Sequence, residues 1–376
     1  VKTFGKSYLW SVHPLTGAGH PSITIAGTDT GRMKTSSPNF FNIPAAKEEG
    51  DADFRAAFMS PEGHYLLGGD YESAEFRIAV DTYRDEVGKT MAESGVDGHA
   101  FTSGMMFHIV KDGGVSAPVG ETVTYERGTT KTPITRFKVP QSWSDERVAE
   151  FALSEEVQNA VKAVEKKLTR VDAKTVTFLW IFGGTAYTLA QRTGLPLKVC
   201  DDFFVRFAST FKGLDKGAKE LAEKAVTENV VQAANGDLYA FSTGYCGIRR
   251  WVKLPQSPHY EWFSNEADWK AAEKQYQRLI KRCQRELINV PMQAGNAVIT
   301  TEALLALADQ GEETGIFPWA SFYDEIVCVA PDSVPVELTK EVGERAMKAA
   351  ADKYTSFVRI GVEFDVAKAG KTWKKS

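Results

Sequence analysis

The chain has 376 residues, of which 43% are hydrophobic and 25% are charged, a composition typical of a globular protein of about two domains. Its formal net charge of −4 excludes a uniformly basic surface for binding nucleic acid. It does not exclude a local basic cleft, because such binding depends on the clustering of cations. The cysteines Cys200, Cys246, Cys283 and Cys328 form no CxxC pair, which indicates a reducing compartment with neither a zinc site nor a disulfide framework. No stretch is apolar for long enough to span a membrane, and no signal-peptide pattern opens the chain.

The first 60 residues are rich in turn-forming side chains. Gly, Pro, Ser and Asn are frequent between Thr28 and Pro44, a segment that includes Arg32. Composition alone favours a surface loop here.

A buried strand followed by a helix is predicted around Asp70. The apolar run at residues 65–67 suits a strand end, and the glycines at 68 and 69 allow a turn or a close approach. The spacing of Phe76, Ala79 and Val80 predicts a helix. Asp70 therefore stands where a rigid carboxylate could hold a metal ion, although an aspartate at such a junction more often caps the helix.

A β-hairpin followed by helix is predicted within residues 109–168. Residues 122–125 and 134–139 alternate around the turn at 127–131, and residues 145–168 have a helical pattern. The cations Arg127, Lys131, Arg136 and Lys138 could touch a nucleic acid or another partner, but a solvated surface hairpin is the favoured interpretation.

Four residues spaced by four, Arg170, Lys174, Phe178 and Phe182, predict one face of a helix. Two cations and two aromatic rings suit a triphosphate and a base or sugar. An amphipathic helix with a solvated cationic end and a buried aromatic end explains the spacing equally well. The glycines at 183 and 184 would end the helix.

Helices dominate the prediction for residues 185–250 and 268–310. The first region ends in the basic pair Arg249-Arg250, which suits phosphate contacts. In the second region, Pro291 would open a new helix. The side chains that step by four and could share one face are Arg285, Asn289 and Gln293.

Residues 319–330 form two short apolar runs around an acidic pair, Asp324-Glu325. On a β-hairpin, both carboxylates would be exposed at the turn and able to bind a cation. Carboxylates gathered from distant parts of a chain are stabilised by a divalent ion. Two Mg²⁺ ions bridged by two aspartates form the site used for in-line nucleotidyl transfer.

Three of these stretches resemble, in order, motifs A, B and C of family A DNA polymerases. Motif A is Asp-Tyr-Ser-x-x-Glu-x-Arg, and residues 70–77 are Asp-Tyr-Glu-Ser-Ala-Glu-Phe-Arg. Motif B is Arg-x3-Lys-x3-Phe-x3-Tyr-Gly, matched within residues 170–184 with Phe182 in place of Tyr. Motif C is His-Asp-Glu, and residues 323–325 are Tyr-Asp-Glu. Segments around Arg32, around Arg285–Gln293 and at the C-terminus resemble the family as well.

The resemblance implies an α+β polymerase right hand, with an antiparallel-sheet palm and mostly helical fingers. We expect the palm at residues 1–95 and 251–376 and the fingers at 96–250, with an insertion at about 109–168. No thumb or 3′–5′ exonuclease pattern is recognisable and the chain does not begin with Met, so we expect an upstream segment or a partner to supply those parts.

The resemblance also implies the roles of individual residues. Asp70 and Asp324, helped by the Tyr71 carbonyl, would bind two Mg²⁺ ions, for which Mn²⁺ would substitute, and Lys174 would act as a general acid. The incoming nucleotide would meet Arg170, Lys174, Phe178, Phe182, Glu75 and His99, with Glu75 blocking a ribose 2′-hydroxyl. The DNA would meet Arg32, Arg249, Arg250, Arg285, Asn289, Gln293 and Tyr323. Glu325 would be an accessory carboxylate.

The expected function is template-directed addition of deoxynucleotides to a primer 3′ end, with primer–template DNA and dNTPs as partners. The expected setting is the cytoplasm of a bacterium or a phage-infected cell. Two alternatives remain: a single-subunit RNA polymerase, and a catalytically silent DNA-binding subunit with the same fold. Glu75 and Phe178 argue against the first, and Asp70, Asp324 and Lys174 argue against the second.

Overall fold

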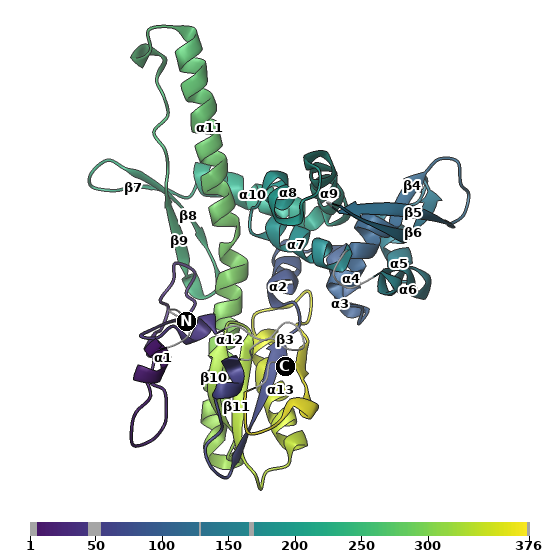
Figure 1. The fold of residues 1–376 in the computed structure, drawn as a ribbon. Coiled ribbons are helices and arrows are strands. Elements are labelled where there is room, and N and C mark those ends of the chain that lie inside the picture. Colours follow the sequence, from purple (N-terminus) through teal and green to yellow (C-terminus); the bar gives the residue numbers. More distant parts are fainter. Residues whose placement is uncertain (1–5, 44–53, 128, 165–168, 374–376) are drawn as a thin grey trace. The chain divides into compact units, whose positions relative to one another are not determined.

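The chain folds into two compact units in the computed structural model (Figure 1). Unit 1 comprises Val1–Ile78, Thr243–Arg250 and Val290–Ser376, and unit 2 comprises Ala79–Ser242 and Trp251–Asn289. The structure describes residues 6–43, 54–127, 129–164 and 169–373, without the side chains of residues 6, 7, 127, 169 and 170.

Unit 1 is built on a four-stranded antiparallel sheet in the order β10-β11-β3-β12. Its strands are β3 (His64–Tyr71), β10 (Phe317–Phe322), β11 (Glu325–Pro331) and β12 (Val362–Phe364). The helices packed with it are α12 (Val290–Thr314) and α13 (Val336–Asp352). Helix α1 (Lys6–Trp10) and the small β1 (Ser22–Thr24) and β2 (Lys34–Ser36) sheet precede β3.

The predicted strand–helix pair around Asp70 is confirmed. β3 is the inner strand between β11 and β12, and helix α2 (Ala74–Tyr83) follows it. The apolar run is buried on both faces, as a central strand requires. Gly69 is needed for close packing, because a Cβ there would overlap the ring of Phe364.

Unit 2 is mostly helical. Its helices are α3 (Glu86–Glu93), α4 (Gly98–Ser103), α5 (Asp145–Ala152), α6 (Glu155–Ala163), α7 (Thr169–Ile181), α8 (Ala186–Thr193), α9 (Leu197–Thr210), α10 (Lys212–Thr227) and α11 (Glu266–Ile288). The helical pattern of residues 145–168 is interrupted at Ser154, whose side chain caps α6 by accepting from the Val157 N–H. Residues 165–168 lie outside the described residues.

The predicted hairpin in this region is confirmed, but it is not a solvated one. Strands β5 (Val119–Arg127) and β6 (Thr130–Pro140) pair antiparallel, and β4 (Ile109–Asp112) adds to β6 in parallel. Tyr125, Ile134 and Phe137 are buried, so one face of the hairpin belongs to the core. Two of its lysines form ion pairs within the hairpin, Lys131 with Glu126 and Lys138 with Glu121.

The largely helical prediction for residues 185–250 is wrong beyond Thr227. The chain forms a three-stranded sheet from β7 (Val230–Gln232), β8 (Leu238–Thr243) and β9 (Arg249–Lys253). The reason is local, because Gly236 takes a left-handed turn with φ +88° and alternate side chains of β8 are buried.

The helical prediction for residues 268–310 is confirmed, with a break. α11 ends at Ile288 with Asn289 as its C-cap, and Pro291 is the second residue of α12. Pro291 has no N–H to continue the first helix. Arg285, Asn289 and Gln293 therefore do not lie on one continuous helix.

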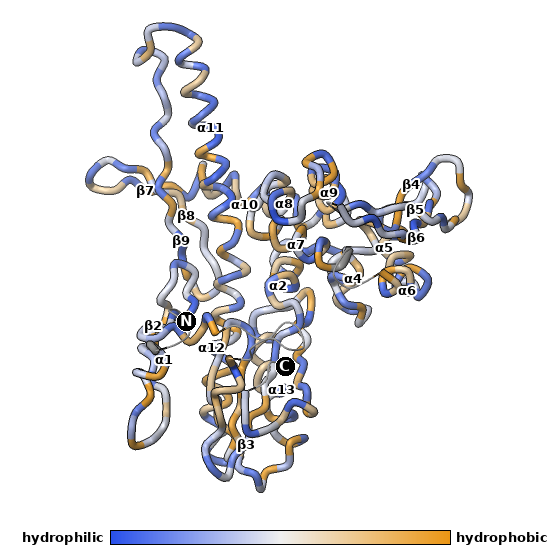
Figure 2. Tube along the Cα trace, in the orientation of Figure 1, coloured by the Kyte–Doolittle hydropathy of each residue, from blue (hydrophilic) through white to orange (hydrophobic). Residues whose placement is uncertain are grey.

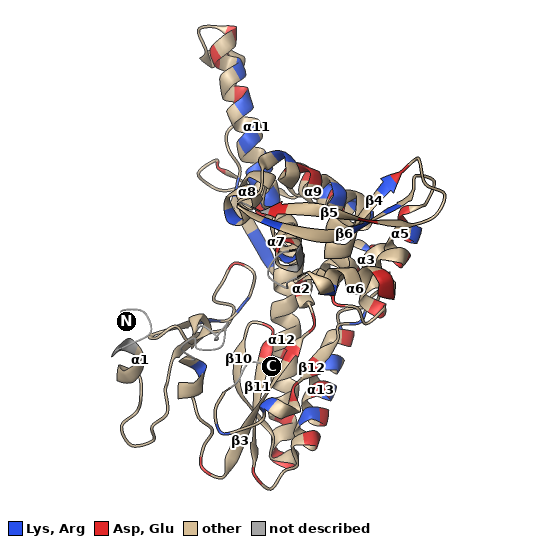
Figure 3. Cartoon of the chain, turned by 45° about the vertical axis from the view of Figure 1, so that its right-hand side comes forward, with Lys and Arg blue, Asp and Glu red and all other residues tan. Residues whose placement is uncertain are grey.

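Apolar and charged residues are distributed differently over these elements. Figure 2 shows apolar residues concentrated in α12 and its sheet, whereas the far end of α11 is hydrophilic. Figure 3 shows acidic and basic residues alternating along α11 and α13, where several form i,i+4 ion pairs. Of the helices described, none is both long and apolar enough to cross a membrane.

The boundaries of the two units differ from the predicted palm and fingers. Residues 79–95 and 251–289 group with unit 2, and residues 243–250 group with unit 1. The division falls within helix α2, between Ile78 and Ala79, and α11 packs against α10 of unit 2. Neither feature can be recognised from changes in amino-acid composition along the sequence.

Candidate functional site

The acidic residues of the two sequence-distant stretches meet at one end of the unit 1 sheet. Asp70 is the register partner of Glu325 across β3 and β11, and the Tyr71 N–H donates to the Asp324 carbonyl oxygen at 3.4 Å. Asp324 occupies the hairpin turn with Tyr323, which has φ +63°. The pairing thus places the backbone of Asp324, in the turn before β11, beside the end of β3 that carries Asp70. Because α2 begins at Ala74, Asp70 does not cap it, and that interpretation is wrong.

The prediction of an exposed Glu325 is wrong. Its side chain is 2% exposed, and its two carboxylate oxygens accept from Arg55 Nη1 at 2.9 Å and Trp373 Nε1 at 3.3 Å. The Arg55 guanidinium also lies 4.0 Å from the centroid of the Trp373 ring. Glu325 is the first residue of β11, and its side chain enters the core instead of the turn. A buried carboxylate is stable only with such partners.

Sequence analysis missed Arg55 and Trp373 as the residues that hold Glu325. The only signal was chemical: a carboxylate in an otherwise apolar strand needs a cation and a donor from elsewhere. Arg55 precedes β3 and Trp373 lies near the C-terminus, so nothing in their spacing relates them.

Glu75 and Arg32, predicted to act on nucleotide and DNA respectively, form an ion pair in unit 1. The guanidinium also lies 5.7 Å from the centroid of the Tyr323 ring. Burial raises the pKa of the Glu75 carboxyl above its ordinary value, Arg32 opposes this rise, and the negative charge of Asp324 adds to it. Glu75 therefore lies within electrostatic reach of the acidic end of the sheet.

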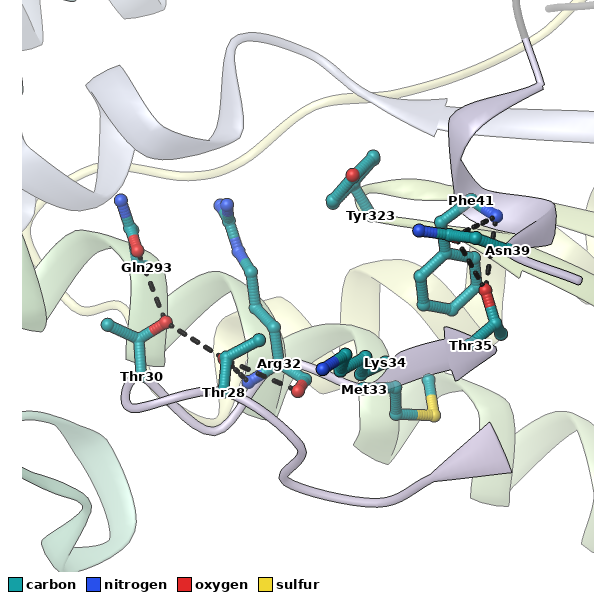
Figure 4. Close-up of a pocket in the computed structure, with 10 residues that line it drawn as sticks. All are labelled: Thr28, Thr30, Arg32, Met33, Lys34, Thr35, Asn39, Phe41, Gln293 and Tyr323. Carbon is teal, nitrogen blue, oxygen red and sulfur yellow. Dashed lines mark hydrogen bonds between the residues drawn. The ribbon is translucent and has the colours of Figure 1, made fainter. Parts of the chain in front are cut away.

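Three residues predicted to bind DNA line one cavity of about 220 Å³. They are Arg32, Gln293 and Tyr323, and Figure 4 shows the Arg32 side chain extending between the other two. The Thr28 hydroxyl accepts from the Arg32 backbone N–H at 3.0 Å, and the Thr30 hydroxyl donates to Gln293 Oε1 at 3.2 Å. The turn at residues 28–32 thereby holds the Arg32 backbone and the Gln293 side chain.

The predicted nucleotide-binding residues other than Glu75 lie in unit 2. Lys174 is exposed on α7, and its Nζ lies 5.7 Å from the centroid of the Phe178 ring. Phe178 and Phe182 are stacked at 5.9 Å and 11°, and the His99 ring is 5.9 Å from Phe178. α7 ends at Ile181 and Gly183 has φ +67°, which confirms the predicted stop. The Arg170 side chain lies outside the described residues.

The remaining predicted DNA contacts divide between the units. Arg249 is exposed at the start of β9, and Arg250 pairs with Asp29, both within unit 1. In unit 2, Asn289 Nδ2 donates to the Phe182 carbonyl at 3.3 Å, and Gly183 packs so closely on Arg285 that a Cβ would lie 2.6 Å from its Cβ. Arg285 and Asn289 therefore support the end of α7.

Metal coordination does not follow from side chains alone. Across the part of the chain that the structure describes, no three His, Cys, Asp or Glu side chains are grouped so that they could hold a metal ion. Any ion at the acidic end of the sheet would need backbone or non-protein oxygen ligands to complete its shell.

Comparison with known proteins defines the class. The sequence model of DNA polymerase family A matches residues 2–116 and 151–375. The chain belongs to DNA polymerase family A. The match omits residues 117–150, which contain the β5–β6 hairpin.

Individual relatives agree with this family. The chain is 25% identical over 365 residues to the thermostable DNA polymerase I of Thermus filiformis, covering 96% of this chain and 33% of that protein. It is 24% identical to DNA polymerase I of Geobacillus stearothermophilus, covering 99% of this chain and 33% of that protein. The chain thus spans about a third of the length of these relatives.

The fold agrees as well. The structure of the POL domain of Pol1 from M. smegmatis, in complex with DNA primer-template and dNTP, matches 98% of this chain and 50% of that chain. The TM-score is 0.61 and the sequence identity 19%. The mixed α and β architecture with antiparallel sheets is therefore that of a family A polymerase domain.

Proposed function

We propose that this chain is the polymerase portion of an enzyme that extends a DNA primer by template-directed addition of deoxynucleotides. The observation that carries the proposal is the pairing of β3 with β11, which brings Asp70 and Asp324 to neighbouring positions from distant parts of the sequence. Membership of DNA polymerase family A supplies the reaction class. The units that we call palm and fingers in this proposal are units 1 and 2.

The residues at the acidic end of the sheet fit divalent cations. Asp70, Asp324 and the Tyr71 carbonyl offer hard oxygen ligands, and Mg²⁺ is commonly bound by one or two carboxylates together with substrate phosphates and waters. Burial is the main cause of the raised pKa of Glu75, and Asp324 adds a negative charge nearby that a cation would offset. When bound, two Mg²⁺ ions, or Mn²⁺ in their place, would acidify the primer 3′-hydroxyl and stabilise charge on the triphosphate.

The unit 2 residues would bind the incoming nucleotide. Lys174, which is exposed on α7, would neutralise the phosphates together with Arg170 and would give a proton to the leaving pyrophosphate. The stacked Phe178 and Phe182 rings would offer an apolar surface to the base and sugar. His99, whose ring lies beside Phe178, would reach the phosphates.

The unit 1 residues would select the sugar and hold the DNA. Glu75, kept in place by Arg32, would exclude a ribose 2′-hydroxyl. Arg32 and Gln293 would meet minor-groove acceptors, which every base pair presents, so these side chains would test pair geometry instead of sequence. Tyr323 would lie against the primer end, and Arg249 and Arg250 would contact phosphates. A thumb, exonuclease or processivity partner would act on the same DNA.

Extension of a labelled primer on a DNA template, with Mg²⁺ and either dNTPs or rNTPs, tests the proposal. We expect dNTPs to extend the primer and Asp324→Ala to reduce the rate by more than about a thousandfold, because several kcal/mol of charge stabilisation would be lost. Glu313→Ala, which changes an exposed acidic residue of α12, is the matched control and should keep full activity.

Three outcomes would contradict the proposal. Preferential extension with rNTPs would support an RNA polymerase. Equal extension by the wild type and Asp324→Ala would show that the assigned site does not catalyse the reaction. Tight binding of primed DNA without extension, even after addition of a thumb-bearing upstream segment, would support a silent DNA-binding subunit.

A further inference from the structure

The β5–β6 hairpin lies outside the segments that the family model matches, yet it is integrated into unit 2. The match stops at residue 116 and resumes at 151. The hairpin joins β4 in a three-stranded sheet and buries Ile134 and Phe137. The hairpin is therefore packed against other elements of unit 2, and its contacts identify them.

β6 of the hairpin packs against residues 104–108 and α6, and β5 contacts α7, the helix that carries Lys174 and Phe178. The Tyr125 hydroxyl of β5 donates to Asp172 Oδ2 of α7 at 2.7 Å. Tyr125 is 7% exposed and Asp172 is 0% exposed. The Tyr125 ring is fixed in turn by an edge-to-face contact with Phe107, at 5.2 Å between centroids. The hydrogen bond therefore lies in the core, where its geometry is well defined and water does not compete.

Asp172 and Lys174 point to different sides of α7. Two residues apart on a helix correspond to a rotation of about 200°, and the side chains differ accordingly, since Asp172 is buried and Lys174 is exposed. Ala173 and Val176 are buried near Asp172. These apolar contacts hold the back of the helix in the core, but they are non-directional and do not by themselves fix its rotation or axial position. A hydrogen bond from a rigid strand does fix them.

We propose that Tyr125 is a positioning residue for α7: the added hairpin anchors the buried side of this helix, and thereby orients the opposite side, which binds the incoming nucleotide. This inference rests on the proposed function for its kinetic consequence only. Tyr125 touches neither nucleotide nor DNA in this proposal and acts through Asp172.

The test compares Tyr125→Phe with Tyr65→Phe. Tyr125→Phe keeps the ring that packs on Phe107 and removes only the hydroxyl. Tyr65→Phe is the matched control, because the Tyr65 hydroxyl is also hydrogen-bonded, to Thr339 Oγ1 at 2.6 Å, but belongs to unit 1. The measurements are KM and kcat for a single dNTP, affinity for primed DNA, and amide hydrogen exchange of residues 171–181.

We expect Tyr125→Phe to raise the KM for dNTP by about 2- to 10-fold, as the loss of one buried hydrogen bond implies, with primed-DNA affinity unchanged. Exchange within α7 should accelerate in Tyr125→Phe and not in Tyr65→Phe. Asp172→Asn, which keeps an acceptor oxygen, should retain more of the wild-type KM than Asp172→Ala does.

Two results would overturn the inference. One is unchanged exchange in α7 of Tyr125→Phe, and the other is an equal rise in KM in Tyr125→Phe and Tyr65→Phe, which would indicate general loss of stability. If the wild type extends no primer, the proposed function fails, whereas hydrogen exchange still decides whether the hairpin anchors α7.

Discussion

Asp70 and Glu325 stand opposite each other across the β3–β11 pair, but their side chains have different environments. Asp70 is half-buried, whereas Glu325 is enclosed by Arg55 and Trp373. The two adjacent acidic residues of the hairpin therefore differ in position. Asp324 lies in the turn, whereas Glu325 links the sheet to the segment before β3 and to the C-terminal segment.

Removing the Glu325 carboxylate should destabilise unit 1. Glu325→Ala takes away an acceptor from the largely buried Arg55 and from the indole of Trp373, and we expect a loss of about 3 kcal/mol in the free energy of unfolding. Urea unfolding followed by circular dichroism measures it. Glu313→Ala on α12 is the control and should change the free energy by less than about 0.5 kcal/mol, because its side chain is exposed. Similar values for the two variants would show that the Arg55 contact adds no stability.

Sugar selection should depend on the size of the side chain at position 75. Glu75→Ala opens the space that the carboxylate fills beside Arg32, so we expect the preference for dNTP over rNTP to fall by about 10- to 100-fold. Single-nucleotide incorporation gives the two kcat/KM values. Glu75→Gln keeps the size of the side chain and should retain the preference. Equal loss of preference in Glu75→Gln and Glu75→Ala would assign selection to charge instead of size.

The stability contribution of Glu75 should decline as pH rises. Burial raises its pKa in the folded state above the ordinary 4.5, so the native protein binds a proton where the unfolded chain has released it. The favourable contribution is then fully present below the unfolded pKa and is lost as pH rises through the folded pKa. We expect the wild type to lose stability relative to Glu75→Gln as the pH rises above the ordinary pKa of 4.5. Urea unfolding of both proteins across this range measures the difference, and a constant or opposite trend would mean that Arg32 outweighs burial.

One thiol should react in the native protein. Cys246 is exposed, whereas Cys200, Cys283 and Cys328 are buried, and burial raises the pKa of the Cys328 thiol to about 12. A thiol reagent should therefore modify Cys246 quickly and Cys328 more than about a hundredfold more slowly. Cys246→Ser should abolish the fast phase, and all four thiols should react after denaturation. A second fast thiol in the native wild type would contradict the burial pattern.

The sequence by itself determined those helices, strands and turns whose patterns depend on residues close together in the chain. The apolar run and helical spacing around Asp70, the alternation that gives β5 and β6, and the glycines that stop α7 each act within a few neighbours, so the chain itself encodes them. The ordered motifs at residues 70–77, 170–184 and 323–325 also depend only on spacing, and they were sufficient to indicate the family.

Tertiary structure decided which charges are buried and what they contact. Glu325 meets Arg55 from 270 positions away, and Tyr125 meets Asp172 from 47 positions away. A carboxylate can be buried only where hydrogen-bond and ion-pair partners offset the free energy of its desolvation. Those partners are brought to it by packing across the whole chain. The same dependence explains why the unit boundaries within α2 and after α11 could not be placed from composition.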